Sequence, residues 1–381
     1  MRVTMLVRCL AMMRGGGETR HLAWARELRA LGVEVDIISG RPLLSRPRYA
    51  VDPEILETRL RSPYARDFVY RFQHQRGFGR LTTNALHIDE EIFCRLAWRQ
   101  IAERPRRPDV VHAHALYQAA RLRLGDIPVV INLPGEPHGR YTADLGRADA
   151  LVADGWAAAH LPGVLGFDVE RVPKGVNAEL FDAEGGSVRE TLRLANKRVI
   201  LAVARLVPLK NIALLLDALA IVRERVAGAH LVIVGDGPEA DALRHRAVAL
   251  EVADAVTFTG YVPQAETPKF YRAADVFALS SDFDNSPNVV LEAMASGLPV
   301  VTTDAGGVSD FLTDRVGGAI VPRRDAGQLA RALQHYLTSP EAARAAGDHN
   351  RARATTEFSW RASALRLLAV YHRVVAARAA A

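Results

Sequence analysis

Short apolar runs alternate with longer segments of mixed apolar and polar residues along the first half of the chain. Over Glu18–Leu31 the apolar residues recur at helical spacing, and Gly32 is typical of a helix C-terminus. Continuously apolar strands that alternate with helices are typical of a parallel sheet covered on both faces. The strands predicted in this half are Arg2–Val7, Val33–Ile38, Asp109–Ala113, Pro128–Leu133 and Asp149–Ala153.

The same alternation restarts after a segment at 169–187 in which a strand leads into Pro173, Gly175, Asn177 and the pair Gly185-Gly186, and we place the domain boundary there. A helix is predicted at Asn211–Val226, and further helices lie between the strands. The amphipathic stretch Ser359–Ala379 either packs locally or crosses back to the first domain. The strands predicted in this half are Arg198–Ala204, His230–Gly235, Ala255–Gly260, Asp275–Ser280 and Pro299–Thr303.

The pattern therefore predicts an α/β protein with two Rossmann-like domains in tandem. The N-terminal domain is expected at 1–175, the C-terminal domain at 176–358 and a terminal helix at 359–381. A length of 381 residues suits two domains.

Cysteine content and hydropathy limit the cellular compartment in which the protein is expected and the kinds of segment it contains. The two cysteines, Cys9 and Cys94, exclude a disulfide framework and a cysteine-rich zinc site and favour a reducing cytoplasm. Arg8 interrupts the apolar start of the chain, which we interpret as a buried strand rather than a signal peptide. No apolar run reaches the roughly 18 residues needed to span a bilayer.

Charge points to polyanionic partners without selecting one. The net charge of +6 suits nucleic acid, anionic lipid or a phosphorylated small molecule. Arg41–Arg80 concentrates arginine and aromatic residues, and we interpret it as a long insertion between a strand and a helix. This segment could contact a phosphorylated or carbohydrate acceptor or an anionic membrane, or it could be a solvated surface.

Two glycine-rich turns follow predicted strands. Gly15-Gly16-Gly17-Glu18 leads into a helix, where glycines allow close backbone approach and free N–H groups can bind phosphate. Its spacing matches neither G-x-G-x-x-G nor a Walker loop, so dinucleotide binding is weakly supported. Gly235–Pro238 fits a structural turn before a helix.

Two cations follow the first strand of the second domain. Arg205 and Lys210 lie between the strand that ends at Ala204 and the helix that begins at Asn211. Cations at the carboxyl end of a parallel strand form a suitable clamp for a diphosphate. They would also offset the charge that develops on a departing phosphate.

The most informative stretch is Asp282–Gly297, a loop of small and polar residues that opens a helix. The N–H groups near Asn288–Val290 can receive a phosphate, and Glu292 can accept hydrogen bonds from sugar hydroxyls. Asp282-Phe283-Asp284 also resembles a D-x-D metal motif, so Mg²⁺ held by a nucleotide is the alternative.

Taken together, these motifs resemble the retaining glycosyltransferases of family 4. The resemblance covers nearly the whole chain and is strongest from Lys174 to Gly307. It is carried by Gly15–Glu18, Asp109–His114, Lys174–Asn177, Arg205–Lys210, Val234–Glu239, Phe258–Val262 and Leu291–Pro299. It implies the GT-B fold, in which two Rossmann-like βαβ domains face each other across a deep cleft.

The resemblance also implies residue roles. Arg205 and Lys210 would hold the diphosphate, Glu292 the ribose hydroxyls, and Gly16 and Gly17 would close over the diphosphate. Catalytic roles fall to Arg205, Lys210 and Asp284, and no metal or other cofactor is implied. The remaining donor contacts implied are Gly235, Gly237, Tyr261, Val262, Ser286, Pro287, Asn288, Val289 and Val290.

The chain departs from the family pattern at two positions. Asp284 replaces the first glutamate of the helix motif, and Pro134 stands where the family has a histidine near the sugar's C6 hydroxyl. His138 is a candidate substitute for that histidine. With His114 and Glu136, it forms the set of expected acceptor or sugar contacts.

The resulting hypothesis is a retaining glycosyltransferase that uses a UDP-sugar, or alternatively a GDP-sugar, and an unidentified hydroxyl acceptor in glycan, glycolipid or natural-product biosynthesis. The alternatives are a sugar-nucleotide epimerase or glycoside phosphorylase on the same fold, and a non-catalytic sugar-nucleotide binder. A nucleic-acid partner is not expected, because the positive charge is dispersed. The expected location is the cytoplasm, with peripheral contact at the inner face of a membrane left open.

Overall fold

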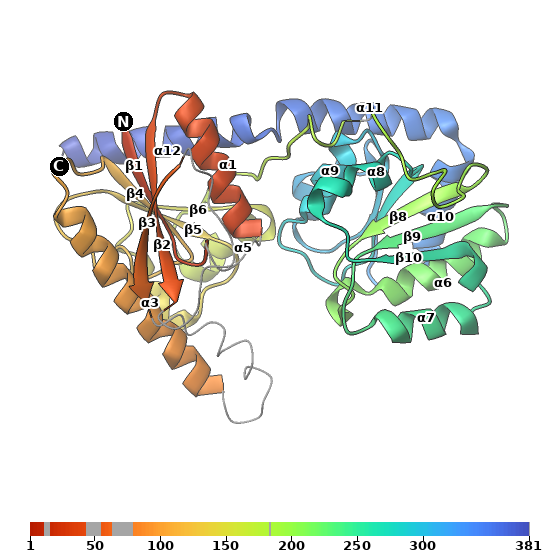
Figure 1. The fold of residues 1–381 in the computed structure, drawn as a ribbon, viewed down its shortest axis with the longest axis horizontal. Helices are drawn as coiled ribbons and strands as arrows, with labels where there is room; N and C mark the ends of the chain where they lie inside the picture. The colour runs from red at the N-terminus through yellow and green to blue at the C-terminus, as the bar shows by residue number, and fades with distance from the viewer. Residues whose placement is uncertain (11–15, 43–54, 63–78, 183, 381) are drawn as a thin grey trace. The chain divides into compact units, whose positions relative to one another are not determined.

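The computed structural model describes residues 1–10, 16–42, 55–62, 79–182 and 184–380. The chain forms two compact units, one of Met1–Pro173 with Ser363–Ala381 and the other of Lys174–Ala362 (Figure 1). These divisions lie a few residues from the boundaries predicted from the sequence. Within the second unit, Val176 N donates to Phe358 O at 2.7 Å and so joins the start of the unit to a residue near its end.

The described strands of the first unit form one parallel sheet in the order β3-β2-β1-β4-β5-β6-β7. All five strands predicted for this half are present, with small shifts at their ends. The bounds are β1 (Arg2–Val7), β2 (Glu34–Pro42), β3 (Leu56–Ser62), β4 (Val110–His114), β5 (Val129–Leu133), β6 (Ala150–Ala153) and β7 (Glu170–Arg171).

Strand β3 corrects the interpretation of Arg41–Arg80 as a plain insertion. Seven residues of that segment pair with β2 in parallel register, from Asp36 opposite Leu56 to Pro42 opposite Ser62. The sequence LETRLRS hides this edge strand, because alternate positions carry charge and only Leu56 and Leu60 are apolar. Residues 43–54 and 63–78 of the segment lie outside the described part of the chain.

Helices cover both faces of the first sheet. Buried residues of α3 (Gly79–Ala102) and α5 (Gly155–Leu165) share one apolar cluster with Leu6 and Val111. The opposite face receives α1 (Gly16–Ala30) and α12 (Trp360–Ala380), which are joined by a 2.7 Å hydrogen bond from Trp24 Nε1 to Ser363 Oγ. The short helices η1 (Gly139–Tyr141) and α4 (Thr142–Leu145) follow β5.

The second unit repeats the architecture with a parallel sheet in the order β10-β9-β8-β11-β12-β13. The five predicted strands are present, and β13, only four residues long, was not predicted. The bounds are β8 (Arg198–Val203), β9 (Ala229–Val234), β10 (Val256–Gly260), β11 (Val276–Leu279), β12 (Val300–Thr303) and β13 (Gly318–Val321).

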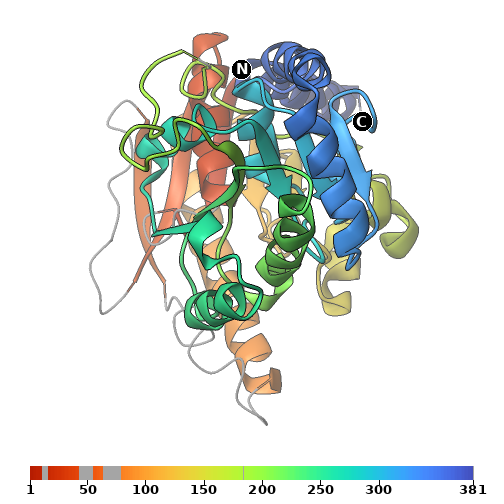
Figure 2. The same ribbon diagram turned by 90° about the vertical axis from the view of Figure 1, so that its right-hand side faces the viewer.

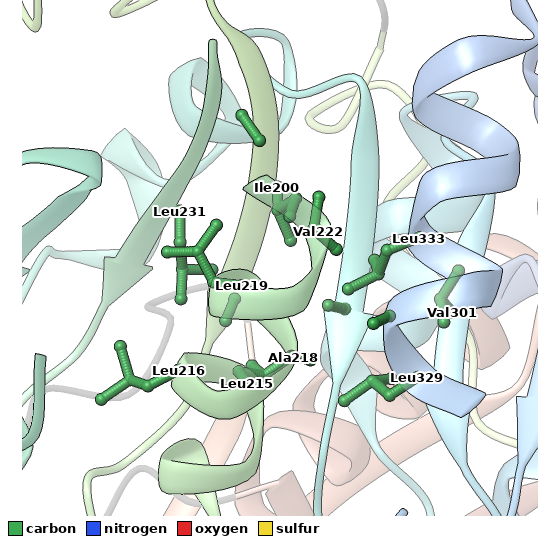
Figure 3. Close-up of a cluster of buried hydrophobic side chains, with 14 of the residues drawn as sticks. Ile200, Leu215, Leu216, Ala218, Leu219, Val222, Leu231, Val301, Leu329 and Leu333 are labelled. Carbon is green, nitrogen blue, oxygen red and sulfur yellow. The ribbon is translucent and has the colours of Figure 1, made fainter. Parts of the chain in front are cut away.

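One face of this sheet is covered by α6 (Ile212–Arg223), α7 (Ala240–Ala249) and α10 (Ala326–Thr338). Helices α6 and α10 lie next to each other, as Figure 2 shows in green and blue. Their leucines belong to one buried cluster with Ile200, Leu231 and Val301 of the strands (Figure 3).

The other face of this sheet packs against α9 (Asn288–Ala295) and the end of α11 (Pro340–Thr356). The short helices of this unit are η2 (Pro208–Lys210), η3 (Ala253–Ala255), η4 (Gln264–Glu266), α8 (Pro268–Tyr271) and η5 (Gly307–Asp310).

Both sheets place their first strand between the second and the fourth. The carboxyl ends of β1 and β4, and those of β8 and β11, are therefore neighbours whose connections run to opposite sides. Ligands of open parallel sheets bind at such a switch point. This geometry locates one candidate site in each unit.

We predict that Leu215→Ala lowers the free energy of unfolding by about 2–5 kcal/mol. Leu215 is 1% exposed within the α6–α10 cluster, so its truncation leaves a cavity. Urea denaturation followed by circular dichroism measures the change. Val248→Ala on α7 is the control, because Val248 is 64% exposed and should change stability by less than about 0.5 kcal/mol. Equal losses in the two variants would contradict this account of the core.

Candidate functional site

Two loops meet at the switch point of the second unit. Lys210 ends the short helix after β8, and its Nζ lies 2.5 Å from Oδ2 of Asp284, which follows β11. Ser281 Oγ donates to the same carboxylate oxygen at 3.1 Å. The backbones are joined as well, because Asp282 N donates to Leu209 O at 2.9 Å. The structure thus brings together two of the three residues predicted to be catalytic.

Asp284 is also held by the loop that follows β12. Its N–H donates to Ala305 O at 2.7 Å, and its carbonyl accepts from Gly307 N at 2.9 Å. Between these partners, Gly306 has φ +87° and an added Cβ would lie 3.0 Å from Asp284 O, so a side chain there would be strained. Three loops therefore hold Asp284 before any ligand contributes.

Arg205, the third predicted catalytic residue, is exposed at the end of β8. Its loop is supported by the turn after β9. A Cβ added to Gly235 would lie 1.9 Å from Ala204 O, and one added to Gly237 would lie 2.3 Å from Leu206 O. These glycines are required for close backbone packing beside Arg205, which agrees with the structural turn predicted for Gly235–Pro238.

The D-x-D pair does not present two free carboxylates. Asp282 contacts Arg324 at 2.9 Å and accepts from Asn211 Nδ2 at 3.3 Å, and the bond from Arg324 lowers the Asp282 pKa. Asp284 is paired with Lys210. Among the described residues there is no group of three or more His, Cys, Asp or Glu side chains placed to hold a metal ion.

Helix α9 carries Glu292 one turn inside its first residue, Asn288. Glu292 is 8% exposed and accepts from Tyr271 Oη at 2.8 Å. Burial raises the pKa of Glu292, although the bonds from Tyr271 and Gln264 act in the opposite direction. The bond from Tyr271 could not be predicted from the sequence, because Tyr271 lies in another short helix, α8.

The loop before α9 contains a buried hydroxyl. Ser286 is 6% exposed, and its Oγ has no hydrogen-bond partner in the described part of the chain. Its carbonyl accepts from Lys174 Nζ at 2.6 Å. A buried hydroxyl of this kind is a candidate contact for a ligand oxygen. The neighbouring predicted contacts Pro287, Asn288, Val289 and Val290 form the start of α9.

The remaining contacts predicted in this unit follow β10. Tyr261 is 77% exposed, which leaves its ring available for stacking. Val262 is half-buried and packs against the core cluster on the α9 side of the sheet.

In the first unit, the glycine turn meets the end of β4. A Cβ on Gly17 would lie 2.2 Å from His114 Nε2, so a side chain there would displace the His114 ring. Asn132 Nδ2 donates to Val152 O at 3.3 Å, which turns Asn132 Oδ1 toward His114 Nδ1 at 3.0 Å. His114 Nδ1 therefore carries the proton. Asn132 was not predicted, although a polar residue inside the apolar run VVINL is a signal of such a role.

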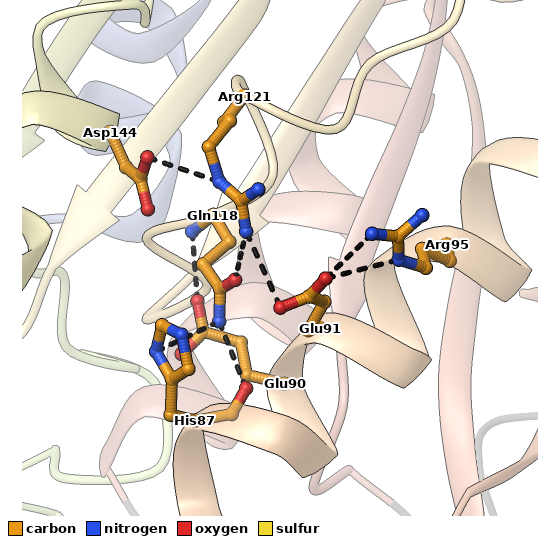
Figure 4. A network of polar contacts seen from close by, with 7 residues as sticks. All are labelled: His87, Glu90, Glu91, Arg95, Gln118, Arg121 and Asp144. Atoms are coloured by element: carbon orange, nitrogen blue, oxygen red, sulfur yellow. Dashed lines mark hydrogen bonds and ion pairs between the residues drawn. The ribbon is translucent and has the colours of Figure 1, made fainter. Parts of the chain in front are cut away.

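A polar network lies beside this region, where α3 meets the segment after β4 (Figure 4). Glu90 Oε1 accepts from Gln118 N at 2.8 Å, and Arg121 bridges Glu91 at 3.5 Å and Asp144 at 3.1 Å. Burial raises the pKa of Glu90 to about 7, against the bond from Gln118 N and the charge of Arg8.

The expected acceptor contacts are distributed over the edge of this unit. His114 is half-buried, whereas Glu136 and His138 are exposed, as is Pro134. His138 Nδ1 accepts from Arg140 N at 3.3 Å and caps η1, which leaves its Nε2 as a donor. Gly16 is exposed at the start of α1, and Gly15 lies outside the described residues.

The amino-acid sequence of the chain is similar to one family model and to curated relatives. Residues 187–353 match the family model described as "Glycosyl transferases group 1". A "GDP-mannose-dependent alpha-(1-6)-phosphatidylinositol monomannoside mannosyltransferase" of Mycobacterium tuberculosis is 35% identical over 209 residues, or 52% of this chain and 54% of the relative. A "D-inositol 3-phosphate glycosyltransferase" of Kineococcus radiotolerans is 34% identical over 298 residues, or 71% of this chain and 66% of the relative. The matches thus span about half to two thirds of the length of these curated relatives.

Solved structures share the fold over nearly the whole chain. A sucrose-phosphate synthase from Thermosynechococcus elongatus superposes with a TM-score of 0.76 at 20% identity, covering 99% of both chains. The Anabaena protein HepE in complex with UDP gives 0.74 at 18% identity, covering 98% of this chain and 100% of its own. Both confirm the predicted α/β fold of the GT-B type.

None of the described helices combines the length and the apolar character that crossing a bilayer requires.

We predict that Glu90 makes stability fall as pH rises from about 4.5 toward 7. Over this range the carboxyl remains protonated in the folded unit but ionises in the unfolded chain, so the unfolded state releases the proton first. Glu90→Gln should remove this dependence, and its stability relative to the wild type should rise by up to about 3 kcal/mol between pH 5 and 8. Denaturant unfolding at several pH values measures the difference.

Glu91→Gln is the matched control, because the bond from Arg95 lowers the pKa of Glu91. Its contribution is present above the unfolded pKa and is lost only as pH falls below it. This variant should therefore show no trend between pH 5 and 8. A flat difference for Glu90→Gln as well would show that Glu90 is ionised throughout.

Proposed function

This chain belongs, through the domain at residues 187–353, to the group 1 glycosyltransferases, and we propose that it transfers a sugar, with retention of configuration, from a nucleotide-diphosphate sugar to a hydroxyl acceptor. The observation that carries the proposal is the Lys210–Asp284 pair beside Arg205 at the switch point of the second sheet. Two cations and a fixed carboxylate at this edge suit a diphosphate joined to a sugar. The proposed setting is the synthesis of a glycan, glycolipid or natural product.

The donor is proposed to bind mainly to the second unit. Arg205 and Lys210 contact the diphosphate, and the buried Ser286 hydroxyl and the first N–H groups of α9 contact its oxygens. Glu292 accepts from the ribose hydroxyls, and its bond from Tyr271 fixes the direction of the carboxylate. Tyr261 offers an exposed ring to the base.

The transfer step breaks one bond, forms one bond and transfers one proton. The bond between the anomeric carbon and the phosphate oxygen breaks, and the acceptor oxygen bonds to the same face of that carbon. The departing phosphate takes the acceptor proton. Arg205 and Lys210 stabilise the charge that develops on this phosphate, which is the main contribution expected of fixed cations at such a site.

We propose that the reaction needs no metal or other cofactor. Support comes from the two carboxylates of the D-x-D segment, which are paired with Arg324 and Lys210. Binding Mg²⁺ through them would require both ion pairs to break. Lysine and arginine already supply the positive charge that a divalent ion would bring.

The nucleotide is proposed to be UDP, with GDP as the alternative. The name of the mycobacterial relative specifies GDP-mannose, and the HepE structure contains UDP. The contacts proposed for Arg205, Lys210 and Glu292 are to the diphosphate and the ribose, which the two nucleotides share. The contacts to the base near Tyr261 therefore determine which of the two nucleotides binds.

The first unit is proposed to bind the acceptor, with His114, Glu136 and His138 near it. Its residues include 28 arginines, no lysine and 20 carboxylates, so the excess positive charge of the chain belongs to this unit. This charge supports an acceptor with an anionic group, such as a phosphate. It also supports peripheral contact with an anionic membrane surface from the cytoplasmic side.

We predict micromolar binding of one nucleoside diphosphate, UDP or GDP, and no requirement for Mg²⁺. Isothermal titration calorimetry at moderate salt, with Mg²⁺ or with EDTA, measures both features. Binding that appears only with Mg²⁺ would overturn the metal-free site. Consumption of donor without acceptor would instead favour an epimerase, and tight binding without turnover would favour a sugar-nucleotide binder.

We predict that Lys210→Ala reduces turnover by about 100-fold or more while the protein remains folded. The variant removes one diphosphate cation and, among the described residues, leaves Asp284 with Ser281 as its side-chain partner. Initial-rate assays with the donor identified by calorimetry measure the effect. Lys269→Ala is the control, because Lys269 pairs with Glu266 at the surface of the same unit. Near-normal turnover in Lys210→Ala would remove Lys210 from the site.

A further inference from the structure

The Lys210–Asp284 pair places a negative charge beside the cation that is proposed to contact the diphosphate. Lys210 Nζ lies 2.5 Å from Asp284 Oδ2, and the two side chains are only 16% and 17% exposed. Ser281 Oγ donates to the same carboxylate oxygen at 3.1 Å. Because the pair is neutral as a whole, Lys210 attracts an anion less strongly than an isolated ammonium would.

The backbone on both sides of this pair is held within the second unit. Asp284 N donates to Ala305 O at 2.7 Å, and Asp284 O accepts from Gly307 N at 2.9 Å. On the other side, Lys210 O accepts from Ser280 Oγ at 2.9 Å. An incoming ligand therefore meets a carboxylate whose main chain is already fixed.

A phosphate can reach Lys210 without breaking the pair, but it then shares the ammonium with Asp284. A lysine ammonium has three N–H donors, of which one is directed at Asp284 Oδ2. A phosphate oxygen that accepts from another of these donors lies close to the carboxylate, since both acceptors are bonded to one nitrogen. Two anionic groups at such a separation repel each other.

The strength of this repulsion depends on whether the nucleotide carries a sugar. The terminal phosphate of a free nucleoside diphosphate has a second ionisation near pH 6 and carries about 1.5 to 2 negative charges at pH 7. In a nucleotide-diphosphate sugar the same phosphate is esterified and carries one charge. The carboxylate of Asp284 therefore opposes binding of the free nucleotide more strongly than binding of the sugar nucleotide.

The sugar also offers the carboxylate something that the free nucleotide lacks. Both side-chain bonds that the described residues make to Asp284 use Oδ2, which leaves Oδ1 as an acceptor. A sugar hydroxyl that donates to Oδ1 forms a charge-assisted hydrogen bond, which is stronger than one between neutral groups. One carboxylate thus acts in opposite directions on the two ligands.

We propose that Asp284 is a specificity-determining residue that favours the sugar-bearing donor over the nucleoside diphosphate left after transfer. Its charge repels the terminal phosphate of the free nucleotide, and its Oδ1 accepts from a hydroxyl of the donor sugar. The inference rests on the proposed function, in which the diphosphate contacts Lys210. It adds to that function a reason for the product nucleotide to leave once the sugar has been transferred.

Asp282 provides a matched control, because it lies in the same loop two residues earlier. Its carboxylate contacts Arg324 at 2.9 Å and accepts from Asn211 Nδ2 at 3.3 Å, and neither bond involves Lys210. Asp282→Asn and Asp284→Asn each remove one negative charge and keep the size of the side chain. Only Asp284→Asn alters the carboxylate that shares the Lys210 ammonium.

The experiment compares the full-length wild type with Asp284→Asn, Asp284→Ala, Asp284→Glu and Asp282→Asn. Isothermal titration calorimetry at pH 7.5 and moderate salt measures the affinity of each protein for UDP, GDP, UDP-glucose and GDP-mannose. Denaturant unfolding shows whether each variant is folded. Asp284→Ala is a second neutral variant, so that either of the two that folds decides the question.

We expect the neutral variants of Asp284 to bind the nucleoside diphosphate about tenfold more tightly than the wild type does, because a nearby like charge has been removed. Their preference for the sugar nucleotide over the free nucleotide should fall by at least the same factor. Asp284→Glu keeps the charge and Asp282→Asn keeps the Lys210 pair, so both should bind the free nucleotide within about twofold of the wild type. A gain in affinity is informative, because damage to a merely structural contact weakens binding.

Three results would overturn this inference alone. The first is unchanged or weaker binding of the free nucleotide by a folded neutral variant of Asp284. The second is an equal gain in Asp282→Asn, which would show that net charge alone matters, and the third is an equal gain in Asp284→Glu. Binding of neither UDP nor GDP to any of these proteins would instead overturn the proposed function.

Discussion

The order of strands in the two sheets is the constraint on which both candidate sites depend. In each sheet the first strand lies between the second and the fourth, so two loops distant in sequence end side by side. This adjacency brings Gly17 to His114 in the first unit and Lys210 to Asp284 in the second. Residues at the carboxyl ends of other strands contribute supporting contacts, as Asn132 does for His114 and Ala305 does for Asp284.

Ion pairs and hydrogen bonds hold the charged side chains of the candidate site in the second unit in fixed positions. Lys210 and Asp284 are part-buried partners, and Asp282 has Arg324 and Asn211. Because these groups are already oriented, a ligand would meet them with little reorganisation, which is the condition under which fixed charges are most effective. The exposed Arg205 differs, since its backbone is held by the glycine turn after β9 while its side chain reaches solvent.

The sequence predicted most of the fold because strongly apolar runs separated by helices leave few alternatives. Strand β3 was missed because its apolar positions are few, and β13 because four residues carry little pattern. In the candidate site, motif residues such as Lys210 and Glu292 could be identified from spacing. The partner of Glu292, which is Tyr271, and that of His114, which is Asn132, depend on side chains meeting across elements. Local sequence carries no information on such meetings, although the buried polar Asn132 was a usable signal.

Helix α12 begins in one unit and ends in the other, with consequences for biosynthesis. Domains commonly fold in the order in which they leave the ribosome. Here the face of the first sheet that holds His112, together with Trp24 of α1, contacts residues of α12 that follow the whole of Lys174–Ala362. The nascent first unit must therefore wait with an incomplete core until the second unit has been translated. Although encoded later, the second unit is the first that can reach its complete native packing.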